Sequence, residues 1–113
     1  MFAGVLKLRL QEEMHEAFLE VWKEVLPEVR KVKGFRFGWC LLGEIGDALS
    51  VGVWETQEDA DAFLQTAVFR RFIDEVRDML DGPPERRVYR IAATEPAEMM
   101  ATLLAIMEVQ IVG

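Results

Sequence analysis

The sequence predicts an α+β fold in which two helices cover one face of a four-stranded antiparallel sheet. The prediction rests on two long segments with helical spacing, four shorter alternating segments, and a glycine-rich connection between the second and third strands. The order strand, helix, strand, strand, helix, strand is that of a ferredoxin-like fold. With 113 residues, of which 51% are hydrophobic, the chain suffices for one such domain.

The first strand and the first helix come from the N-terminal third of the chain. In residues 2–10, three leucines alternate with other side chains, which is typical of a strand with two unlike faces. Residues 12–32 are predicted to form the first helix, because their apolar side chains follow one helical stripe. We expect Pro27 to kink or divide this helix and Gly34 to end it.

The second and third strands are predicted over residues 35–42 and 48–55, and residues 43–47 connect them as a hairpin. Alternation in the second strand gives one face made of Phe35, Phe37, Trp39 and Leu41. In the third strand, one face carries Leu49, Val51 and Val53, and the other carries Ser50, Gly52 and Trp54. Both strands therefore have apolar groups on both of their faces.

The second helix is predicted to begin after Thr56, whose side chain can cap it. Its apolar pattern changes phase near residues 66–68, so we expect two helical pieces with a bend between them. Residues 82–84 read Gly-Pro-Pro and end the helix. The fourth strand is predicted over residues 87–93.

Residues 1–93 thus form the predicted domain, and residues 94–113 form a C-terminal extension. The extension is predicted to contain a helix over residues 95–107 and a weakly alternating strand over residues 108–112. Because helices cover only one face of the sheet, the apolar outer face calls for a partner. We expect a homodimer with its sheets packed face to face and the extension packed on the dimer. The alternative is an extension that folds back over its own sheet.

Composition excludes several classes of function. The net charge of −7 argues against binding to nucleic acid, which requires clustered basic residues. The apolar runs are too short to cross a membrane, and the N-terminus lacks the pattern of a signal peptide. A single cysteine, Cys40, cannot form an internal disulfide. We therefore expect a soluble, cytoplasmic protein.

The stretch around the second helix is similar to a known family signature. Residues 53–59 read Val-Trp-Glu-Thr-Gln-Glu-Asp, and Ala-Phe-Leu at 62–64 is followed by Thr-Ala-Val-Phe-Arg-Arg-Phe at 66–72. This pattern resembles the antibiotic biosynthesis monooxygenase family, whose third strand typically ends in Trp-Glu before a capped helix. Members of that family are dimeric α+β barrels. The resemblance covers residues 2–93 and leaves the extension unexplained.

The resemblance implies a cofactor-independent monooxygenase that acts on a small or polycyclic phenol or quinol. Haem-degrading relatives use an Asn, a Trp and an axial His at positions that here hold Leu6, Phe63 and Ile73. None of these side chains can ligate iron, so no haem is expected, and the resemblance to cofactor-independent enzymes implies no other cofactor. Relatives often carry a histidine where this sequence has Val68.

His15 is the only histidine, and hence the only side chain that ordinarily titrates near neutral pH. It is the candidate catalytic base, although a solvated position on the first helix is the commoner outcome for such a residue. No second histidine is present to activate a nucleophile. One His and one Cys, far apart in the sequence, do not form a metal site.

Aromatic side chains are the candidate ligand-binding residues, because planar apolar ligands bind in aromatic-walled pockets. The candidates are Phe18, Trp22, Trp39, Phe63, Phe72 and Tyr89. They can equally fill the core, which is what aromatic stripes usually do. The donors considered for a developing oxyanion are Arg9, Arg36 and Tyr89. Two basic pairs are expected to form surface ion pairs instead, namely Arg70, Arg71, Arg86 and Arg87.

Two functions follow from these residues. The first is the cofactor-independent monooxygenase. The second is a non-enzymatic dimeric module of the same fold that binds a small hydrophobic or aromatic ligand or mediates assembly. A cavity of roughly 300 Å³ or more between helices and sheet favours the enzyme, whereas a filled core favours the module.

Overall fold

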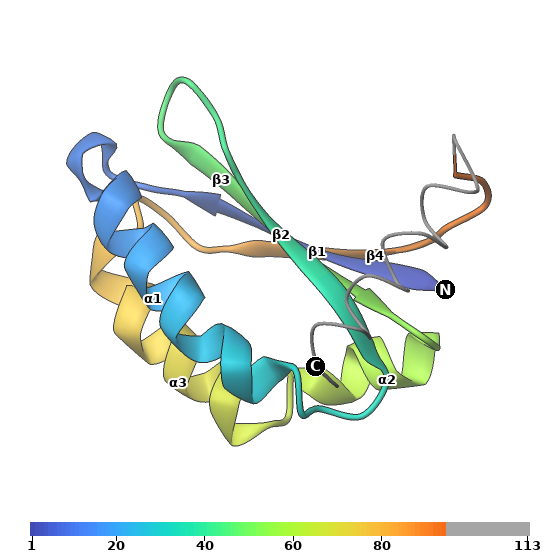
Figure 1. Ribbon diagram of the computed structural model, residues 1–113. Helices are drawn as coiled ribbons and strands as arrows, with labels where there is room; N and C mark the ends of the chain where they lie inside the picture. Colours follow the sequence, from blue (N-terminus) through green and yellow to red (C-terminus); the bar gives the residue numbers. More distant parts are fainter. Residues whose placement is uncertain (95–113) are drawn as a thin grey trace, which may run out of the picture.

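A four-stranded antiparallel sheet with helices on one face is the architecture of the protein, as the sequence predicts. The computed structural model describes residues 1–94. Its elements are β1 (Phe2–Arg9), η1 (Glu12–Met14), α1 (His15–Val29), β2 (Phe35–Leu42), β3 (Asp47–Trp54), α2 (Gln57–Phe63), α3 (Ala67–Val76), η2 (Arg77–Met79) and β4 (Glu85–Arg90). Figure 1 shows α1, α2 and α3 on the same side of the sheet. The expectations for the C-terminal extension lie outside the described residues.

The strands are arranged in the order β2-β3-β1-β4, and every neighbouring pair is antiparallel. β1 and β3 therefore lie in the middle of the sheet, as the split βαβ order requires. One cross-strand row runs through three glycines, because Gly38 pairs with Gly52 and Gly52 pairs with Gly4.

The predicted alternation of β2 is wrong at its first residue. The pairing between β2 and β3 shifts register between Phe35 and Phe37, which indicates a bulge at Arg36. An extra residue reverses the faces of a strand on either side of the bulge. Phe35 consequently packs against the core on the helix side, whereas Phe37 stacks on Trp39 with ring centroids 4.9 Å apart.

The ends of α1 and β4 also differ from the prediction. α1 is continuous through Pro27 and ends at Val29. Backbone hydrogen bonds between residues three apart then turn the chain toward β2. β4 ends at Arg90 because its only neighbour is β1, where the last paired residue is Phe2. One further backbone hydrogen bond, from the N–H of Ile91 to the carbonyl of Met1 at 2.9 Å, continues the ladder to the first residue of the chain.

The second helical segment is divided into two pieces as expected. Thr56 accepts a hydrogen bond from the backbone N–H of Asp59 at 3.0 Å and caps α2. Thr66 accepts one from the N–H of Phe69 at 3.2 Å and caps α3. The hydroxyl of Thr66 also donates to the carbonyl of Phe63 at 2.7 Å, so one residue ends the first piece and starts the second.

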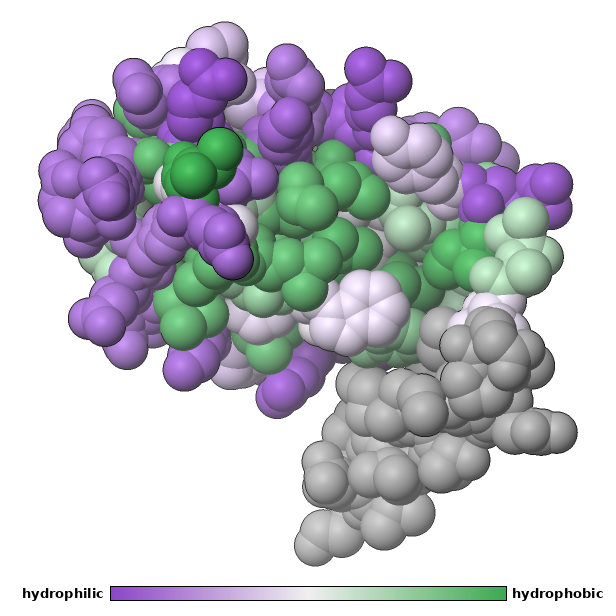
Figure 2. Space-filling view, turned by 90° about the horizontal axis from the view of Figure 1, so that it is seen from above, coloured by the Kyte–Doolittle hydropathy of each residue, from purple (hydrophilic) through white to green (hydrophobic). Residues whose placement is uncertain are grey.

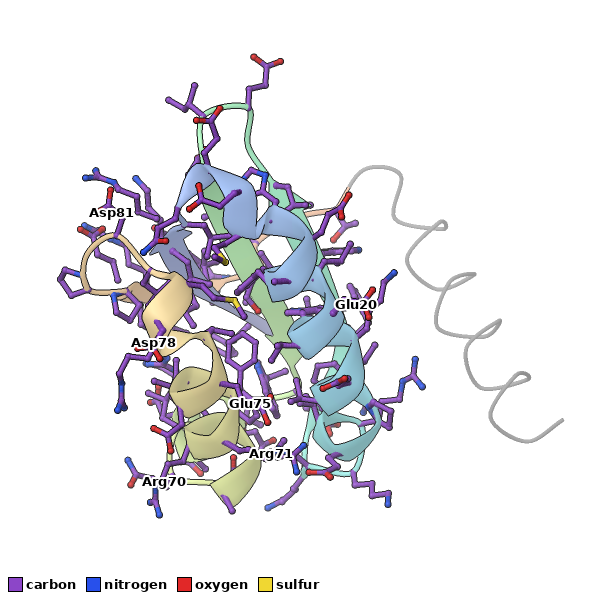
Figure 3. All side chains as sticks on the ribbon, turned by 90° about the vertical axis from the view of Figure 1, so that its left-hand side faces the viewer. Glu20, Arg70, Arg71, Glu75, Asp78 and Asp81 are labelled. Atoms are coloured by element: carbon purple, nitrogen blue, oxygen red, sulfur yellow. The ribbon has the colours of Figure 1, made fainter. Side chains whose placement is uncertain are left out.

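The core lies between the sheet and the helices. Its buried members are Leu8, Leu10, Phe18, Val25, Val29, Ala48, Val68, Phe72 and Val76. The solvent side of the helical layer is charged: Figure 3 shows Glu20, Arg70 and Glu75 projecting from it. Arg71 lies between the two long helices and pairs with Glu28 of α1 at 3.0 Å.

The opposite face of the sheet is apolar. Trp39, Leu41 and Tyr89 are between 44% and 52% exposed there, an unusual degree for such large side chains. Figure 2 looks onto this outer face and shows apolar side chains over its middle, with hydrophilic side chains along much of the rim. The sheet thus has one face in the core and one apolar outer face, on which Phe37 and Val53 are buried while Trp39, Leu41 and Tyr89 are partly exposed.

Candidate functional site

A cavity lies between the glycine row of the sheet and the helices. Its volume is about 80 Å³ and it opens to solvent. This is well below the roughly 300–1,000 Å³ of pockets for drug-sized ligands. The lining residues are Gly4, Val5, Leu6, Trp22, Val25, Leu26, Val29, Phe35, Gly38, Ser50, Val51, Gly52, Trp54, Ala60, Phe63, Leu64, Phe69, Phe72 and Arg86.

The floor of the cavity exists because three adjacent strands present glycine at the same level. A side chain on Gly38 would meet the ring of Trp22 at 3.6 Å, which places this row on the helix side of the sheet. A Cβ on Gly52 would lie only 2.8 Å from Trp54 Nε1. Glycine is therefore required at Gly52 for the indole to lie against the sheet.

Aromatic rings form one wall of the cavity. Trp54 contacts Phe35 at 5.3 Å and Phe63 at 4.9 Å between ring centroids. Phe63 in turn contacts Phe69 at 5.2 Å across the break between α2 and α3. These four rings come from the ends of β2 and β3 and from both pieces of the second helical segment. Such a wall suits a flat apolar ligand.

The other wall carries a fixed polar pair. Trp22 Nε1 of α1 donates a hydrogen bond to Ser50 Oγ of β3 at 3.0 Å. This bond orients the Trp22 ring over the floor and satisfies the indole N–H, which would otherwise be costly to bury.

Arg86 brings the only ionisable group to the lining. Its Nη2 donates to the carbonyl of Ala60 at 3.0 Å and to Asp61 Oδ1 at 3.0 Å. The sequence predicts a surface ion pair here. The pair with Asp61 is present, and Arg86 also belongs to the cavity.

Cys40 lies next to Ser50 in the sheet, on the side of the core. Burial raises the pKa of the Cys40 thiol above its ordinary value, because the thiolate would lose solvation. The thiol is thus held in its neutral, unreactive form at neutral pH.

The aromatic residues predicted to bind a ligand separate into three groups. Trp22, Phe63 and Phe72 line the cavity. Phe18 is fully buried behind Phe72, with ring centroids 5.9 Å apart, and is a core residue.

Trp39 and Tyr89 project from the outer face of the sheet, on the side away from the cavity. Strand alternation explains this placement, because each is one residue away from a position that faces the helices.

His15 begins α1, about 10 Å along the helix axis from Trp22, and does not line the cavity. Its Nε2 is buried and makes no hydrogen bond to the described residues. Of the donors considered for an oxyanion, Arg36 pairs with Glu55 at 2.9 Å. Neither Arg9 nor Arg36 lines the cavity.

Sequence reasoning missed three features of the site. These are the glycine row, the place of Arg86 in the cavity lining, and the indole N–H of Trp54 beside the floor. A signal for the row is present in the sequence, since each predicted strand from the first to the third contains an interior glycine. Only the register shows that Gly4, Gly38 and Gly52 are neighbours.

Within residues 1–94, no group of three or more His, Cys, Asp or Glu side chains is placed to hold a metal ion. None of the helices in that range has both the length and the apolar character needed to cross a membrane.

Comparison with family models gives one match. The model described as antibiotic biosynthesis monooxygenase matches residues 1–75. No curated protein sequence matches the chain significantly.

Several solved structures share the fold. One from Nitrosomonas europaea, proposed to be an antibiotic biosynthesis monooxygenase, is 19% identical with a TM-score of 0.72, covering 82% of this chain and 100% of its own. One from Bordetella bronchiseptica, with the same proposed identity, is 16% identical with a TM-score of 0.74, covering 81% and 97%. A conserved protein from Methanosarcina mazei is 18% identical with a TM-score of 0.70, covering 79% and 90%. At these identities the likeness shows the fold.

Proposed function

Because the chain belongs to the antibiotic biosynthesis monooxygenase family, we propose that it is a cofactor-independent monooxygenase that binds a small planar phenol or quinol. The observation that supports the proposal is the composition of the cavity, a glycine floor under aromatic walls, and not its free volume of about 80 Å³, which lies below the roughly 300 Å³ that favours an enzyme. A flat ring can lie on the glycine floor, with Trp22 of α1 on one wall and Phe63 on the aromatic wall, and Phe72 also belongs to the lining. These three residues are our proposed ligand-binding residues.

The proposed reaction needs no bound electron carrier, because the substrate itself is the reductant. A ring carbon of the phenolate gives an electron pair to dioxygen, and a C–O bond forms. The O–O bond then breaks as the hydrogen on that carbon leaves as a proton and water departs. One phenol and one dioxygen thus yield one quinone and one water. The cavity contributes orientation and exclusion of water from the reacting carbon.

Oxygen uptake tests this proposal directly. The chain is supplied with a panel of naphthols and quinols, and an oxygen electrode is read together with quinone absorbance. We expect one dioxygen consumed per quinone formed. The indole N–H of Trp54 lies over the glycine floor, and we assign it as a donor to the charge that develops on the substrate oxygen. Trp54→Phe keeps a ring but removes this N–H, so it should slow turnover tenfold or more, because a lost donor of this kind costs at least about 1.4 kcal/mol. No uptake with any member of the panel contradicts the enzyme.

A non-enzymatic binding module is the second candidate function. The free volume of about 80 Å³ favours it, because little open space is available for a substrate and dioxygen together. In that case an aromatic ligand binds, as followed by the fluorescence of Trp22 and Trp54, without any uptake of oxygen. The two measurements made on the same ligand separate the two functions.

We also propose that the protein is a homodimer in which the apolar outer faces of two sheets pack together. The exposed Trp39, Leu41 and Tyr89 support this assembly, since a single chain leaves them in water. The proposal agrees with the described helices, which all lie on the other face of the sheet (Figure 1).

A further inference from the structure

The polar groups of the cavity are nearly all hydrogen-bond donors. Among its lining residues, the side chains with polar atoms are Ser50, the two tryptophans and Arg86. The hydroxyl oxygen of Ser50 already accepts the hydrogen bond of Trp22. Within residues 1–94, the lining therefore includes no carboxylate, imidazole or amine that could take a proton from a bound ligand.

Arg86 retains donors for such a ligand. Only its Nη2 hydrogen bonds to residues 1–94, namely to Ala60 and Asp61, so the N–H groups of Nη1 and Nε are available. The ion pair holds the guanidinium in place, with 26% of the Arg86 side chain exposed. Since the Asp61 side chain is 53% exposed, water screens its charge, and the positive charge of Arg86 is only partly offset.

Trp54 supplies a second donor near the floor. Its Nε1 lies close to the glycine row, 2.8 Å from the Cβ position of Gly52 and 3.7 Å from that of Gly4. This N–H makes no hydrogen bond to any residue in the described range 1–94. Gly4 neighbours Val88 of β4, and Arg86 lies on the same face of that strand. Both donors therefore belong to the same side of the sheet.

We propose that the cavity selects the anionic form of its ligand, a phenolate or acidic enol that is already ionised in solution, with its oxygen on Arg86 and Trp54. This inference rests on the proposed function and names its substrate class. A neutral hydroxyl would lose the water that accepts its proton, and the side-chain acceptor in the described lining is Ser50 Oγ, which already accepts the hydrogen bond of Trp22. An oxyanion gains charge-assisted hydrogen bonds instead. The protein then needs no general base, which agrees with the position of His15 outside the cavity.

The test uses 4-nitrophenol, whose anion absorbs visible light while its neutral form does not. The electron-withdrawing nitro group makes the ring a poor reductant, so the dye reports binding without turnover. Titration of the free and the protein-bound dye gives two pKa values. We expect the pKa of the bound dye to be lower by one unit or more, which corresponds to at least tenfold tighter binding of the anion.

Variants at two adjacent arginines assign the effect. Arg86→Gln should remove most of the pKa shift of the dye, and Arg86→Lys, which keeps the charge, should retain part of it. Arg87→Gln is the matched control, because Arg87 is exposed and points to the other face of β4. It should leave the shift unchanged.

Three results overturn the inference. A bound dye whose pKa is equal to or above that of the free dye means that the cavity prefers the neutral form. An equal effect of Arg87→Gln means that general surface charge is responsible. A dye that does not bind at all removes the ligand site on which the proposed function depends as well, whereas the first two results leave that site in place.

Discussion

Trp54 shows how one residue combines packing with a functional role. Its ring lies between Phe35 and Phe63, and its indole N–H lies over Gly52. The N–H reaches the cavity because Gly52 of the same strand and Gly4 of the neighbouring strand carry no side chain. The residue-scale chemistry of the site thus depends on glycines that carry no chemistry themselves.

Gly52→Ala should disturb this arrangement. The new Cβ would lie 2.8 Å from Trp54 Nε1, so the indole must move. We expect a loss of about 1–3 kcal/mol in the free energy of unfolding, as for overpacked sites, and weaker binding of 4-nitrophenol. Urea unfolding and dye titration measure the two effects.

Gly4→Ala is the matched control, because its Cβ would find its nearest neighbour at 3.7 Å, an ordinary contact. It should preserve stability far better than Gly52→Ala, and the comparison is confined to stability because Gly4 itself belongs to the cavity floor. Equal losses of stability in the two variants would mean that the indole does not depend on Gly52.

At the scale of elements, the break between α2 and α3 builds one wall of the cavity. The phase change in the apolar pattern predicts the break. Thr66 stabilises it, because its side chain caps α3 and also donates a hydrogen bond to the carbonyl of Phe63 at the end of α2. An unbroken helix could not bring Phe63 and Phe69 together, because residues six apart lie on different faces. The break instead places their rings 5.2 Å apart.

Thr66→Ala removes both hydrogen bonds at this break. We expect a decrease of about 1 kcal/mol in the free energy of unfolding, the typical cost of a lost N-cap. For a domain of this size the melting temperature should fall by roughly 4–8 °C. Circular dichroism during heating gives the value.

Thr66→Ser keeps the hydroxyl and should retain most of the stability, since Ser caps helices about as well as Thr. If the Ser and Ala variants melt at the same temperature, the hydroxyl of Thr66 does not stabilise the break.

At the scale of the molecule, the two faces of the sheet differ in their surroundings. The face under the helices holds the core and the cavity, whereas the outer face presents exposed apolar side chains (Figure 2). A monomer would keep this apolar area in contact with water, and a second copy can cover it. The proposed homodimer therefore follows from the whole sheet and from no single residue.

Leu41→Lys places a charge on the outer face and should convert the proposed dimer to monomers, because burying an unpaired ammonium is costly. Sedimentation velocity measures the change in mass. Ile45→Lys is the control: Ile45 lies at the tip of the β2–β3 hairpin and is 92% exposed, so a lysine there should leave the mass unchanged. A wild-type chain that sediments as a monomer, or a Leu41→Lys dimer, would contradict the face-to-face assembly.

The sequence by itself determined the order of the elements, the hairpin, the divided second helix and the family. Hydrophobic periodicity, turn residues and capping residues are local, so they can be read along the chain. Trp22, Phe63 and Phe72 were among the predicted ligand-binding residues for the same reason, since helical spacing places them toward the sheet. The shift at Arg36 was not foreseen, because a bulge depends on the partner strand.

Only the tertiary structure decided which of these residues meet. The register between strands aligns Gly4, Gly38 and Gly52 into one floor, and the alternation of β4 turns Arg86 toward the cavity and Tyr89 away from it. The length of α1 separates His15 from Trp22. Residues distant in sequence become neighbours through strand pairing and packing. Neither the pairing nor the packing can be recognised from a single position of the chain. The cavity is therefore a property of the fold, built from residues whose individual types are unremarkable.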